Sequence, residues 1–573
     1  MGHLVADELV NRLVQAGVKR IYGIVGDSLN PVTDAVRRNG KIDWIHVRHE
    51  ETAAFAAGAE AQLTGKLTAC AGSCGPGNLH LINGLFDAHR SMAPVLAIAS
   101  HVPSSEIGTN YFQETHPESL FKECSNYCEL ISNPKQVDRV LHIAMQSAVG
   151  NLGVSVIVLP GDVAGMEMPA SNTPRSVFDH RPIMRPCDDE LAQLADMVNS
   201  ARKVTLFCGF GCAQAHDQVI ALAEKVKAPV GVAYRGKWYV AYDNPFDVGM
   251  NGLLGYGAAY EAVHECDLLL LLGTDFPYDH FLPTKSKIAQ VDMRVDHLGR
   301  RSRLDLGLWG DVGETIKALL PLVQPKEDRS FLDAMLSRHR AAVEKLNVSV
   351  DHVGKRRMPP QPVAAALNEI GASDAIFTAD TGMCNVWSAR YLTPTKDRRL
   401  LASFSHGSMA NALPQAIGAQ LCFPDRQVIA MAGDGGLAML MGDLLTVTQY
   451  NLPIKIVVFD NGALGMVKVE MELDGLPDWQ TDLRNPDFAK VAEAMGIKGI
   501  RIENPADLHS GIKQALDHDG PVLVDAITDP NVLSLPNITE EQMTGFALSM
   551  GKLVLSGNID EVLDTVEANL PQV

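Results

Sequence analysis

Short apolar segments alternate with helical patterns along the whole chain, and this alternation constrains the fold more than any other feature. Each segment is rich in Val, Ile or Leu and is bounded by Gly, Pro or Asp, which is typical of parallel strands covered on both faces. The clearest segments are residues 95–99, 154–159, 204–208, 268–272, 428–431, 454–459 and 522–525. The pattern predicts α/β domains with doubly wound parallel sheets.

Two proline-containing stretches divide the 573 residues into parts of ordinary domain size. They are residues 165–187 and residues 321–362, the second with a helical pattern between its prolines. These linkers predict a first domain over residues 1–180, a second over 181–335 and a third over 336–530. A C-terminal extension, residues 531–573, follows.

The first and third domains repeat one sequence rhythm. The first contains ACAGSCGPGNLHLINGLFDAHRSMAPVLAIAS, and the third contains AMAGDGGLAMLMGDLLTVTQYNLPIKIVVFDN. Both read as strand, glycine-rich turn, helix, short break, proline and strand. We therefore expect three stacked domains, of which the first and third are homologous and the middle one differs.

The charge of the chain limits its partners. The formal net charge is −19, which argues against nucleic-acid binding, because phosphate backbones are held mainly by excess Lys and Arg. No uninterrupted apolar run reaches about 18 residues, so no membrane-spanning helix is expected. These features favour a cytoplasmic enzyme that binds no nucleic acid.

The sharpest motif is Gly433-Asp434-Gly435-Gly436, directly after a strand-like segment. Its glycines let the backbone approach a phosphate, and Asp434 offers a hard oxygen to a metal. The next strand ends at Asp460-Asn461, where the Asn461 side chain and the carbonyl of Ala463 can supply further oxygens. Few protein oxygens beside phosphate are what Mg²⁺ prefers. The predicted metal ligands are Asp434, Asn461 and Ala463.

This paired motif resembles that of the thiamine-diphosphate enzyme family, in which GDG is followed by NN at the end of the next strand. Here Asp460 replaces the first Asn, while the second, which binds the metal in the family, is present. A further match is Ser405-His406-Gly407-Ser408-Met409, where the resemblance implies that Met409 holds the cofactor's two rings bent. The resemblance also implies that the Gly407 carbonyl accepts a hydrogen bond from the aminopyrimidine ring. The residues implied to bind thiamine diphosphate in this domain are His406, Gly407, Ser408, Met409, Asp434, Gly435, Gly436, Asn461, Gly462, Ala463, Leu464 and Gly465.

In the first domain, Arg48-His49-Glu50-Glu51 precedes an alanine-rich helix pattern. In the family a glutamate at this place shares a proton with the pyrimidine ring, and the match assigns that role to Glu50. Its neighbour Glu51 receives no role. Because Glu50 and the diphosphate motif are far apart in sequence, the resemblance implies a site between two subunits of a homotetramer.

The middle domain resembles the flavin-binding domain of some family members. Its run Gly209-Phe210-Gly211 lacks the third glycine of a dinucleotide fingerprint, so a nicotinamide site is not expected. Other segments match those that hold FAD, and Asp292, at the end of a strand, suits ribose hydroxyls. The implied FAD residues are Asn251, Gly252, Leu253, Leu254, Thr274, Asp275, Phe276, Pro277, Tyr278 and Asp292.

Over almost its full length the chain resembles the bacterial flavin-linked pyruvate oxidases, also called quinone-dependent pyruvate dehydrogenases. The resemblance implies oxidative decarboxylation of pyruvate to acetate and CO₂ with thiamine diphosphate and Mg²⁺, the electrons passing through FAD to a quinone. It places Phe112 and Gln113 beside the reacting centre, and Met466 and Glu470 on a mobile segment next to it. Met466 and Thr381 depart from the residues usual there.

Three alternatives remain. An acetolactate synthase-type carboligase would keep FAD as a structural group, although the Trp usual after the LGM segment is missing here. A keto-acid lyase without flavin redox chemistry is another, and a catalytically silent relative is the third.

The C-terminal extension resembles a terminal helix that docks on the membrane in the quinone-linked enzymes, which implies a peripheral position at the inner face of the cell membrane. It has an apolar face, Ile559, Val562, Leu563 and Val566, opposite the acidic residues Asp560, Glu561, Asp564 and Glu567. Membrane-surface helices usually carry Lys and Arg there, so packing on the protein body is equally open.

Overall fold

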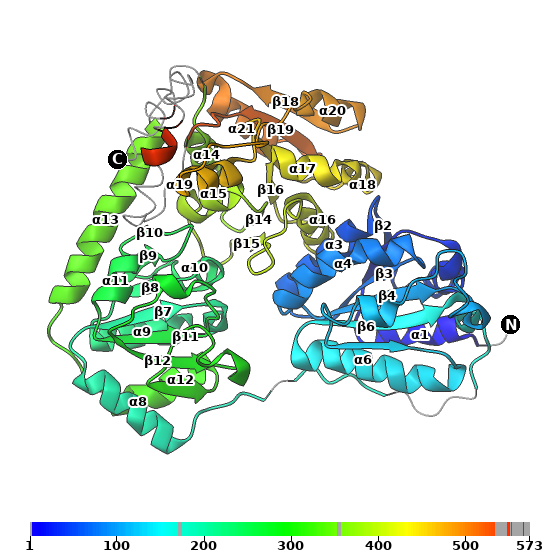
Figure 1. Cartoon of the computed structure of the whole chain (residues 1–573), viewed down its shortest axis with the longest axis horizontal. Coiled ribbons are helices and arrows are strands. Elements are labelled where there is room, and N and C mark those ends of the chain that lie inside the picture. The colour runs from blue at the N-terminus through cyan, green and yellow to red at the C-terminus, as the bar shows by residue number, and fades with distance from the viewer. Residues whose placement is uncertain are drawn as a thin grey trace.

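A computed structural model describes residues 3–169, 175–180, 182–351, 357–532, 547–550, 552 and 565. Three lobes, each built on one sheet, make up the molecule (Figure 1). The N-terminal lobe is blue to cyan, the middle lobe is green and the C-terminal lobe is yellow to orange. The apolar runs of the sequence all lie in strands, and the prediction of three parallel-sheet α/β domains is confirmed.

The first sheet has the order β2-β1-β3-β4-β6-β5 and is parallel throughout. Its strands are β1 (Arg20–Gly23), β2 (Asp43–His46), β3 (Thr68–Gly72), β4 (Val95–His101), β5 (Tyr127–Leu130) and β6 (Val154–Pro160). The helices are α1 (Val5–Gln15), α2 (Asn30–Asn39), α3 (Glu50–Thr64), α4 (Pro76–Arg90), α5 (Pro117–Leu120), α6 (Val137–Asn151) and α7 (Gly161–Ala164).

The middle sheet has the order β10-β9-β8-β7-β11-β12-β13, parallel except that β10 runs antiparallel to β9. Its strands are β7 (Val204–Cys208), β8 (Val230–Val232), β9 (Asp247–Met250), β10 (Tyr256–Gly257), β11 (Leu268–Leu272), β12 (Lys287–Asp292) and β13 (Leu306–Trp309). The helices are α8 (Asp188–Ser200), α9 (His216–Val226), α10 (Tyr234–Val240), α11 (Ala259–Glu265) and α12 (Val312–Leu319). The long helix α13 (Ser330–Asp351) then runs from the middle lobe toward the C-terminal lobe (Figure 1).

The third sheet has the order β15-β14-β16-β17-β19-β18 and is parallel. Its strands are β14 (Ile376–Ala379), β15 (Arg399–Ala402), β16 (Val428–Gly433), β17 (Lys455–Asp460), β18 (Lys498–Ile502) and β19 (Val522–Ile527). The helices are α14 (Pro360–Ile370), α15 (Met383–Tyr391), α16 (Ala412–Cys422), α17 (Asp434–Leu440), α18 (Leu444–Gln449), α19 (Gly465–Leu473), α20 (Phe488–Ala494) and α21 (Leu508–Leu516). Counted within each lobe, its strand order is that of the first sheet, as expected for two homologous domains.

Each sheet is apolar on both faces, which explains the uninterrupted apolar runs. In β4, Leu96 and Ile98 join one buried cluster, whereas Val95, Ala97 and Ala99 join the cluster on the opposite face. Successive side chains of a strand point to opposite faces, so a sheet covered by helices on both sides needs apolar residues at every position.

The N- and C-terminal lobes meet where α3 packs against α16. The alanine-rich sequence of α3 permits this close approach. A Cβ at Gly418 of α16 would lie 2.3 Å from the carbonyl oxygen of Ala56, so only glycine fits at this crossing.

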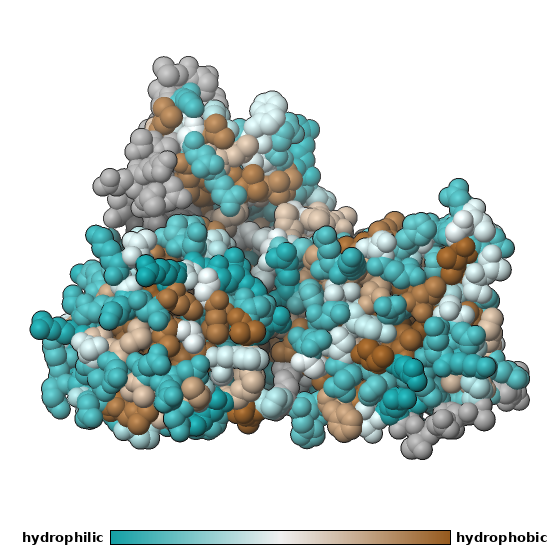
Figure 2. Space-filling model, turned by 60° about the horizontal axis from the view of Figure 1, so that its bottom comes forward, coloured by the Kyte–Doolittle hydropathy of each residue, from teal (hydrophilic) through white to brown (hydrophobic). Residues whose placement is uncertain are grey.

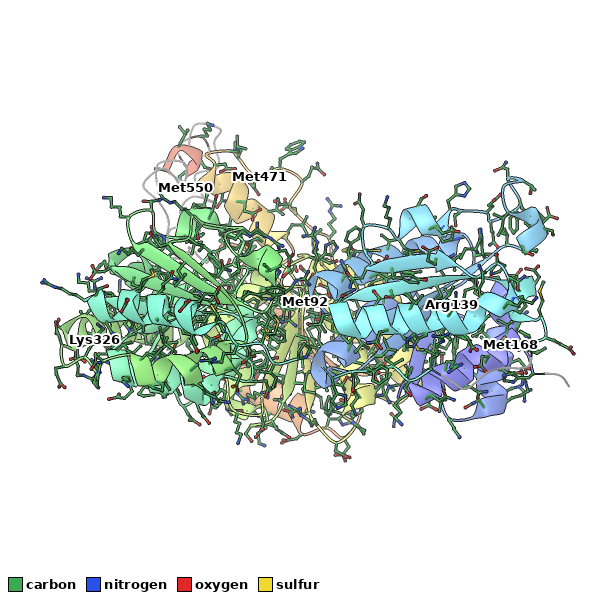
Figure 3. The ribbon with its side chains drawn as sticks, turned by 90° about the horizontal axis from the view of Figure 1, so that it is seen from below. Met92, Arg139, Met168, Lys326, Met471 and Met550 are labelled. Atoms are coloured by element: carbon green, nitrogen blue, oxygen red, sulfur yellow. The ribbon has the colours of Figure 1, made fainter. Side chains whose placement is uncertain are left out.

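The face shown in Figure 2 is a mosaic in which hydrophilic residues predominate. In the described part of the chain, no helix combines the length and the apolar content needed to cross a bilayer. The predicted C-terminal amphipathic helix, residues 559–567, lies almost wholly outside the described residues. Of the preceding extension, Met550 lies at the same edge as Met471 of α19 (Figure 3), and the Ser549 hydroxyl donates to the carbonyl of Leu476 at 3.0 Å.

Candidate active site

The predicted metal ligands lie together at the carboxyl edge of the third sheet. Gly433, at the end of β16, is in register with Phe459 of the parallel strand β17, so the residues after the two strands are neighbours. Asp434 begins α17, and its Oδ2 accepts a hydrogen bond from the backbone N–H of Gly462 at 2.8 Å. The amide oxygen of Asn461 accepts from the N–H of Ala463 at 2.9 Å.

Asn485, which no sequence motif singled out, joins two carboxylates at this edge. Its Nδ2 donates to Asp434 Oδ2 and to Asp460 Oδ1, each at 2.7 Å. Burial, with a contribution from the charge of Asp460, raises the pKa of Asp434 to about 6. A divalent cation relieves repulsion between neighbouring carboxylates, so the residues fit Mg²⁺ bound by Asp434, Asn461 and the carbonyl of Ala463.

Three of the predicted cofactor segments converge on Gly435. A Cβ at this position would lie 3.4 Å from Cε of Met409 and 3.2 Å from Cδ2 of Leu464. Gly407 has a φ of +73°, which favours glycine, and a Cβ there would meet no atom within 4 Å. The segments 406–409, 434–436 and 461–465 therefore pack on each other around Gly435, while Gly407 borders open space.

Asp380, also missed by sequence reasoning, ties two of these segments together. Its Oδ1 accepts from the N–H of Ala412 at 2.8 Å and its Oδ2 from the N–H of Gly433 at 3.1 Å. Burial raises the pKa of this carboxyl to about 7. Next to it, the Thr381 hydroxyl is buried and has no hydrogen-bond partner among the described residues.

Glu50 lies in the N-terminal lobe with a largely buried side chain. The helix was expected to begin after Glu51, but α3 begins at Glu50, because His49 caps it by accepting a hydrogen bond from the N–H of Glu51 at 3.2 Å. His80 Nδ1 donates to the Glu50 carboxylate at 2.9 Å. A Cβ at Gly77 would lie 3.0 Å from Glu50 Oε1, so glycine leaves room for this carboxylate.

Gln113 and Glu50 both contact the turn formed by residues 73–77. A Cβ at Gly75 would lie 2.7 Å from the carbonyl oxygen of Gln113, and the Cys74 thiol donates to Gln113 Oε1 at 3.5 Å. Gln113 itself has a φ of +64°, which is unusual for a residue with a side chain. Phe112 is 78% exposed on the adjoining loop. The turn 73–77 thus brings Glu50 and Gln113 together.

The predicted flavin segments gather at the carboxyl edge of the middle sheet, where α/β sheets bind ligands. Asn251 follows β9, residues 274–278 follow β11, and Asp292 ends β12. A Cβ at Gly252 would lie 3.0 Å from the Phe276 ring, so the first two segments touch. Leu253 is partly exposed, and Leu254 packs against the core.

Two carboxylates at this edge differ in their surroundings. Asp292 is buried, and its Oδ1 accepts from the N–H of Arg294 at 2.9 Å, with His297 Nδ1 3.5 Å away. Asp275 forms ion pairs with Arg300 at 2.8 Å and Arg301 at 3.1 Å. A buried carboxylate at a strand end fits ribose hydroxyls, whereas Asp275 is held by its own loop.

Helix α19 directly follows the turn that bears Asn461 and Ala463. Met466 and Glu470 lie on it, and Met466 packs against the apolar core of the C-terminal lobe. Burial raises the pKa of Glu470, and the charge of Glu470 adds to the burial that raises the pKa of Tyr278. Glu470 therefore lies within electrostatic range of a predicted flavin residue.

Glu50 and the predicted diphosphate-binding segments are not joined to each other within the described residues. In the described parts, no hydrogen bond or ion pair links Glu50 to the segments 434–436 and 461–465. The N-terminal lobe instead contacts the 403–409 segment through α4, where Asn83 donates to the Ser408 hydroxyl at 2.8 Å.

Comparison with known proteins identifies every lobe. Residues 4–120 match the family described as "Thiamine pyrophosphate enzyme, N-terminal TPP binding domain", residues 191–319 match its central domain, and residues 380–526 match its C-terminal TPP binding domain. Thiamine pyrophosphate and thiamine diphosphate are one compound.

Three relatives illustrate the range of the family. An uncharacterized 42.6 kDa protein of Pseudomonas amyloderamosa is 60% identical over 60% of this chain and 87% of its own. Pyruvate oxidase of Lactiplantibacillus plantarum is 31% identical over 92% of this chain and 89% of its own. The acetolactate synthase large subunit of Parasynechococcus marenigrum is 30% identical over 91% of this chain and 86% of its own. With all three of its lobes matched and near-full-length relatives, this chain belongs to the thiamine pyrophosphate enzyme family.

Proposed function

We propose that this enzyme oxidatively decarboxylates pyruvate with thiamine diphosphate, Mg²⁺ and FAD, and passes the electrons to a quinone. Pyruvate and water give acetate, CO₂, two protons and two electrons, and FAD takes up the electrons. The relative named pyruvate oxidase supports the substrate and the reaction.

The position of α19 carries this proposal. The helix begins at Gly465, directly after the turn that bears Asn461 and Ala463, and the charge of its Glu470 acts on Tyr278 of the flavin segments. A single short helix therefore starts at the edge that fits the diphosphate and carries a carboxylate within electrostatic range of the edge that fits FAD. Such proximity is what electron transfer from one cofactor to the other requires.

The chain's own residues divide the remaining tasks. When bound, thiamine diphosphate supplies the carbon centre that takes up the electron pair released with CO₂, and FAD supplies the acceptor for that pair. Asp434, Asn461 and Ala463 hold the cation, and Met409 supports the cofactor rings. Glu50 holds a proton at the pyrimidine ring nitrogen, with His80 fixing the carboxylate.

Gln113 and Phe112 border the substrate. The positive φ of Gln113 and its contact with the turn 73–77 fix the backbone there. Phe112 is exposed in the single chain, and Glu50 makes its contacts within its own lobe. Both observations support a site completed between subunits, and we propose a homotetramer.

An acetolactate synthase-type carboligase is the second candidate, because a relative with that name matches with similar identity and coverage. In that case the flavin would be structural. We further propose a cytoplasmic enzyme that contacts the inner face of the cell membrane through its C-terminal extension when it reduces quinone.

An anaerobic mixing experiment tests the proposal. Purified protein is mixed with thiamine diphosphate, Mg²⁺ and pyruvate, and the flavin absorbance near ~450 nm is followed together with the products. Bleaching with formation of acetate supports the oxidase. Unbleached flavin with accumulating acetolactate would assign the carboligase reaction instead. The variant Glu50→Gln serves as the control that should neither bleach nor form product at a comparable rate.

A further inference from the structure

We propose that Asn83 and Asp87 of α4 are positioning residues, which hold residues 403–409 in the conformation that binds the cofactor's aminopyrimidine. The inference rests on the proposed function, since it concerns the same site. It assigns a role to a face of α4 whose side chains contact the C-terminal lobe.

Asp87 acts through a chain of hydrogen bonds. The Ser403 hydroxyl donates to Asp87 Oδ1 at 2.6 Å, and the same hydroxyl oxygen accepts from the backbone N–H of Ser408 at 2.9 Å. Gln415 of α16 donates to the other carboxylate oxygen at 3.4 Å. The buried carboxylate thus fixes both ends of the loop 403–408.

Asn83, one helical turn earlier, contacts the same loop at His406 and Ser408. Its Nδ2 donates to the Ser408 hydroxyl at 2.8 Å and to Glu51 Oε1 at 2.7 Å. Its Oδ1 lies 2.8 Å from His406 Nε2. Because the amide nitrogen already donates twice, the oxygen is the acceptor, and His406 carries a proton on Nε2.

The His406 ring is also held by stacking. It lies on Phe86 with ring centroids 5.5 Å apart and an interplanar angle of 11°. Phe86 lies between Asn83 and Asp87 in sequence, so a single turn of α4 contacts the loop at His406, Ser408 and Ser403. Glu51, which received no role from the sequence, orients Asn83.

The chemistry of Asp87 suggests a size-conserving perturbation. Both of its oxygens accept hydrogen bonds, whereas an asparagine would turn an NH₂ group toward either the Ser403 hydroxyl or the Gln415 amide. If the NH₂ group faces Gln415, two donors meet in a buried place. If it faces Ser403, the hydroxyl must accept and can no longer donate to residue 87, so in either case one of the two hydrogen bonds donated to residue 87 is lost. Asp87→Asn therefore weakens the hold on the loop without removing bulk.

A control must separate positioning from general adhesion of the two lobes. Tyr450→Phe is suitable, because the Tyr450 hydroxyl accepts from the backbone N–H of His46 at 2.7 Å. This bond also joins the N- and C-terminal lobes, but it lies outside the loop 403–409. Both variants are expected to lower the thermal stability of the protein slightly.

The experiment measures binding of thiamine diphosphate with Mg²⁺ to the cofactor-depleted full-length protein, by calorimetry, and steady-state kinetics at saturating cofactor. For Asp87→Asn and for Ser403→Ala we expect the dissociation constant to rise about tenfold, since each weakens the same hydrogen-bond chain. The double variant should show no further rise. Turnover at saturating cofactor should stay within about threefold of the wild type, because Asp87 is not expected to touch the reacting atoms.

Other outcomes would overturn the inference. If Asp87→Asn binds the cofactor as tightly as Tyr450→Phe does, the contact of Asp87 with the loop only holds the two lobes together and does not position the loop. If Asp87→Asn fails to fold, Ser403→Ala decides the question by the same measurement, with Ser403→Thr as the variant that restores binding. If the wild type itself does not bind thiamine diphosphate, the proposed function fails first, and this inference with it.

Discussion

Replacing Gly436 with alanine would introduce a steric clash inside the candidate site. The new Cβ would lie 2.4 Å from Oδ2 of Asp380 and 3.3 Å from the backbone nitrogen of Ala410. Asp380 cannot move away without loss, because its carboxylate accepts hydrogen bonds from the N–H groups of Gly433 and Ala412. The substitution therefore places a methyl group against a buried carboxylate that accepts two hydrogen bonds.

The magnitude follows from three effects. Overpacking a rigid site costs about 1–3 kcal/mol, and losing one hydrogen bond to a carboxylate costs about 1.5–3 kcal/mol. Alanine gains about 0.5–1 kcal/mol over glycine in a helix. The net destabilisation is about 1.5–5.5 kcal/mol, which for a domain of this size lowers the Tm by at least about 3 °C.

Calorimetry of the cofactor-free protein measures this shift, and Gly435→Ala is the matched control. A Cβ at Gly435 would meet only the ends of the Leu464, Leu483 and Met409 side chains, at 3.2–3.4 Å. Those ends can yield, so the control should keep a Tm within about 2 °C of the wild type. If the two variants melt together, the reasoning about Asp380 is refuted.

Three further predictions concern the cofactors. Glu50→Gln should bind thiamine diphosphate normally but lower turnover with pyruvate by about two orders of magnitude or more; wild-type turnover would remove Glu50 from its role. Because burial raises the pKa of Asp434 to about 6, protons compete with the cation, so Mg²⁺ affinity should be constant above pH ~7 and fall about tenfold per unit below pH ~6. A titration showing equal affinity at acid and neutral pH would contradict this. Asp292→Ala should weaken FAD binding about tenfold or more in reconstitution monitored by absorbance, whereas Asp296→Ala, an exposed carboxylate on the same loop, should not; equal effects would argue against a specific contact of Asp292.

The sequence was most informative where burial is complete. The run Leu268–Leu272 contributes alternately to two apolar clusters on opposite faces of the sheet, so its composition alone indicated a strand. Edge strands were harder to recognise. β2 mixes exposed and buried residues, and the two-residue β10 is defined only by its antiparallel pairing with β9.

The same contrast holds at the candidate site. Asp434, Asn461 and Met409 lie in local motifs, so a resemblance could point to them. Asn485, Asp380 and the Asn83–Asp87 face of α4 are isolated polar residues in sequence. Only the folding of the sheet and the contact between lobes bring them to the site, and no local pattern could have revealed them.

The strand order shared by the two outer sheets also bears on the history of the molecule. β3 and β16 hold the same place in their sheets, and each is followed by a glycine-rich turn: one makes room for the Glu50 carboxylate, and the other carries Asp434. We infer that one ancestral gene was duplicated before these tasks existed separately. Under the proposed function, the equivalent loops of the two copies serve opposite ends of a single small molecule.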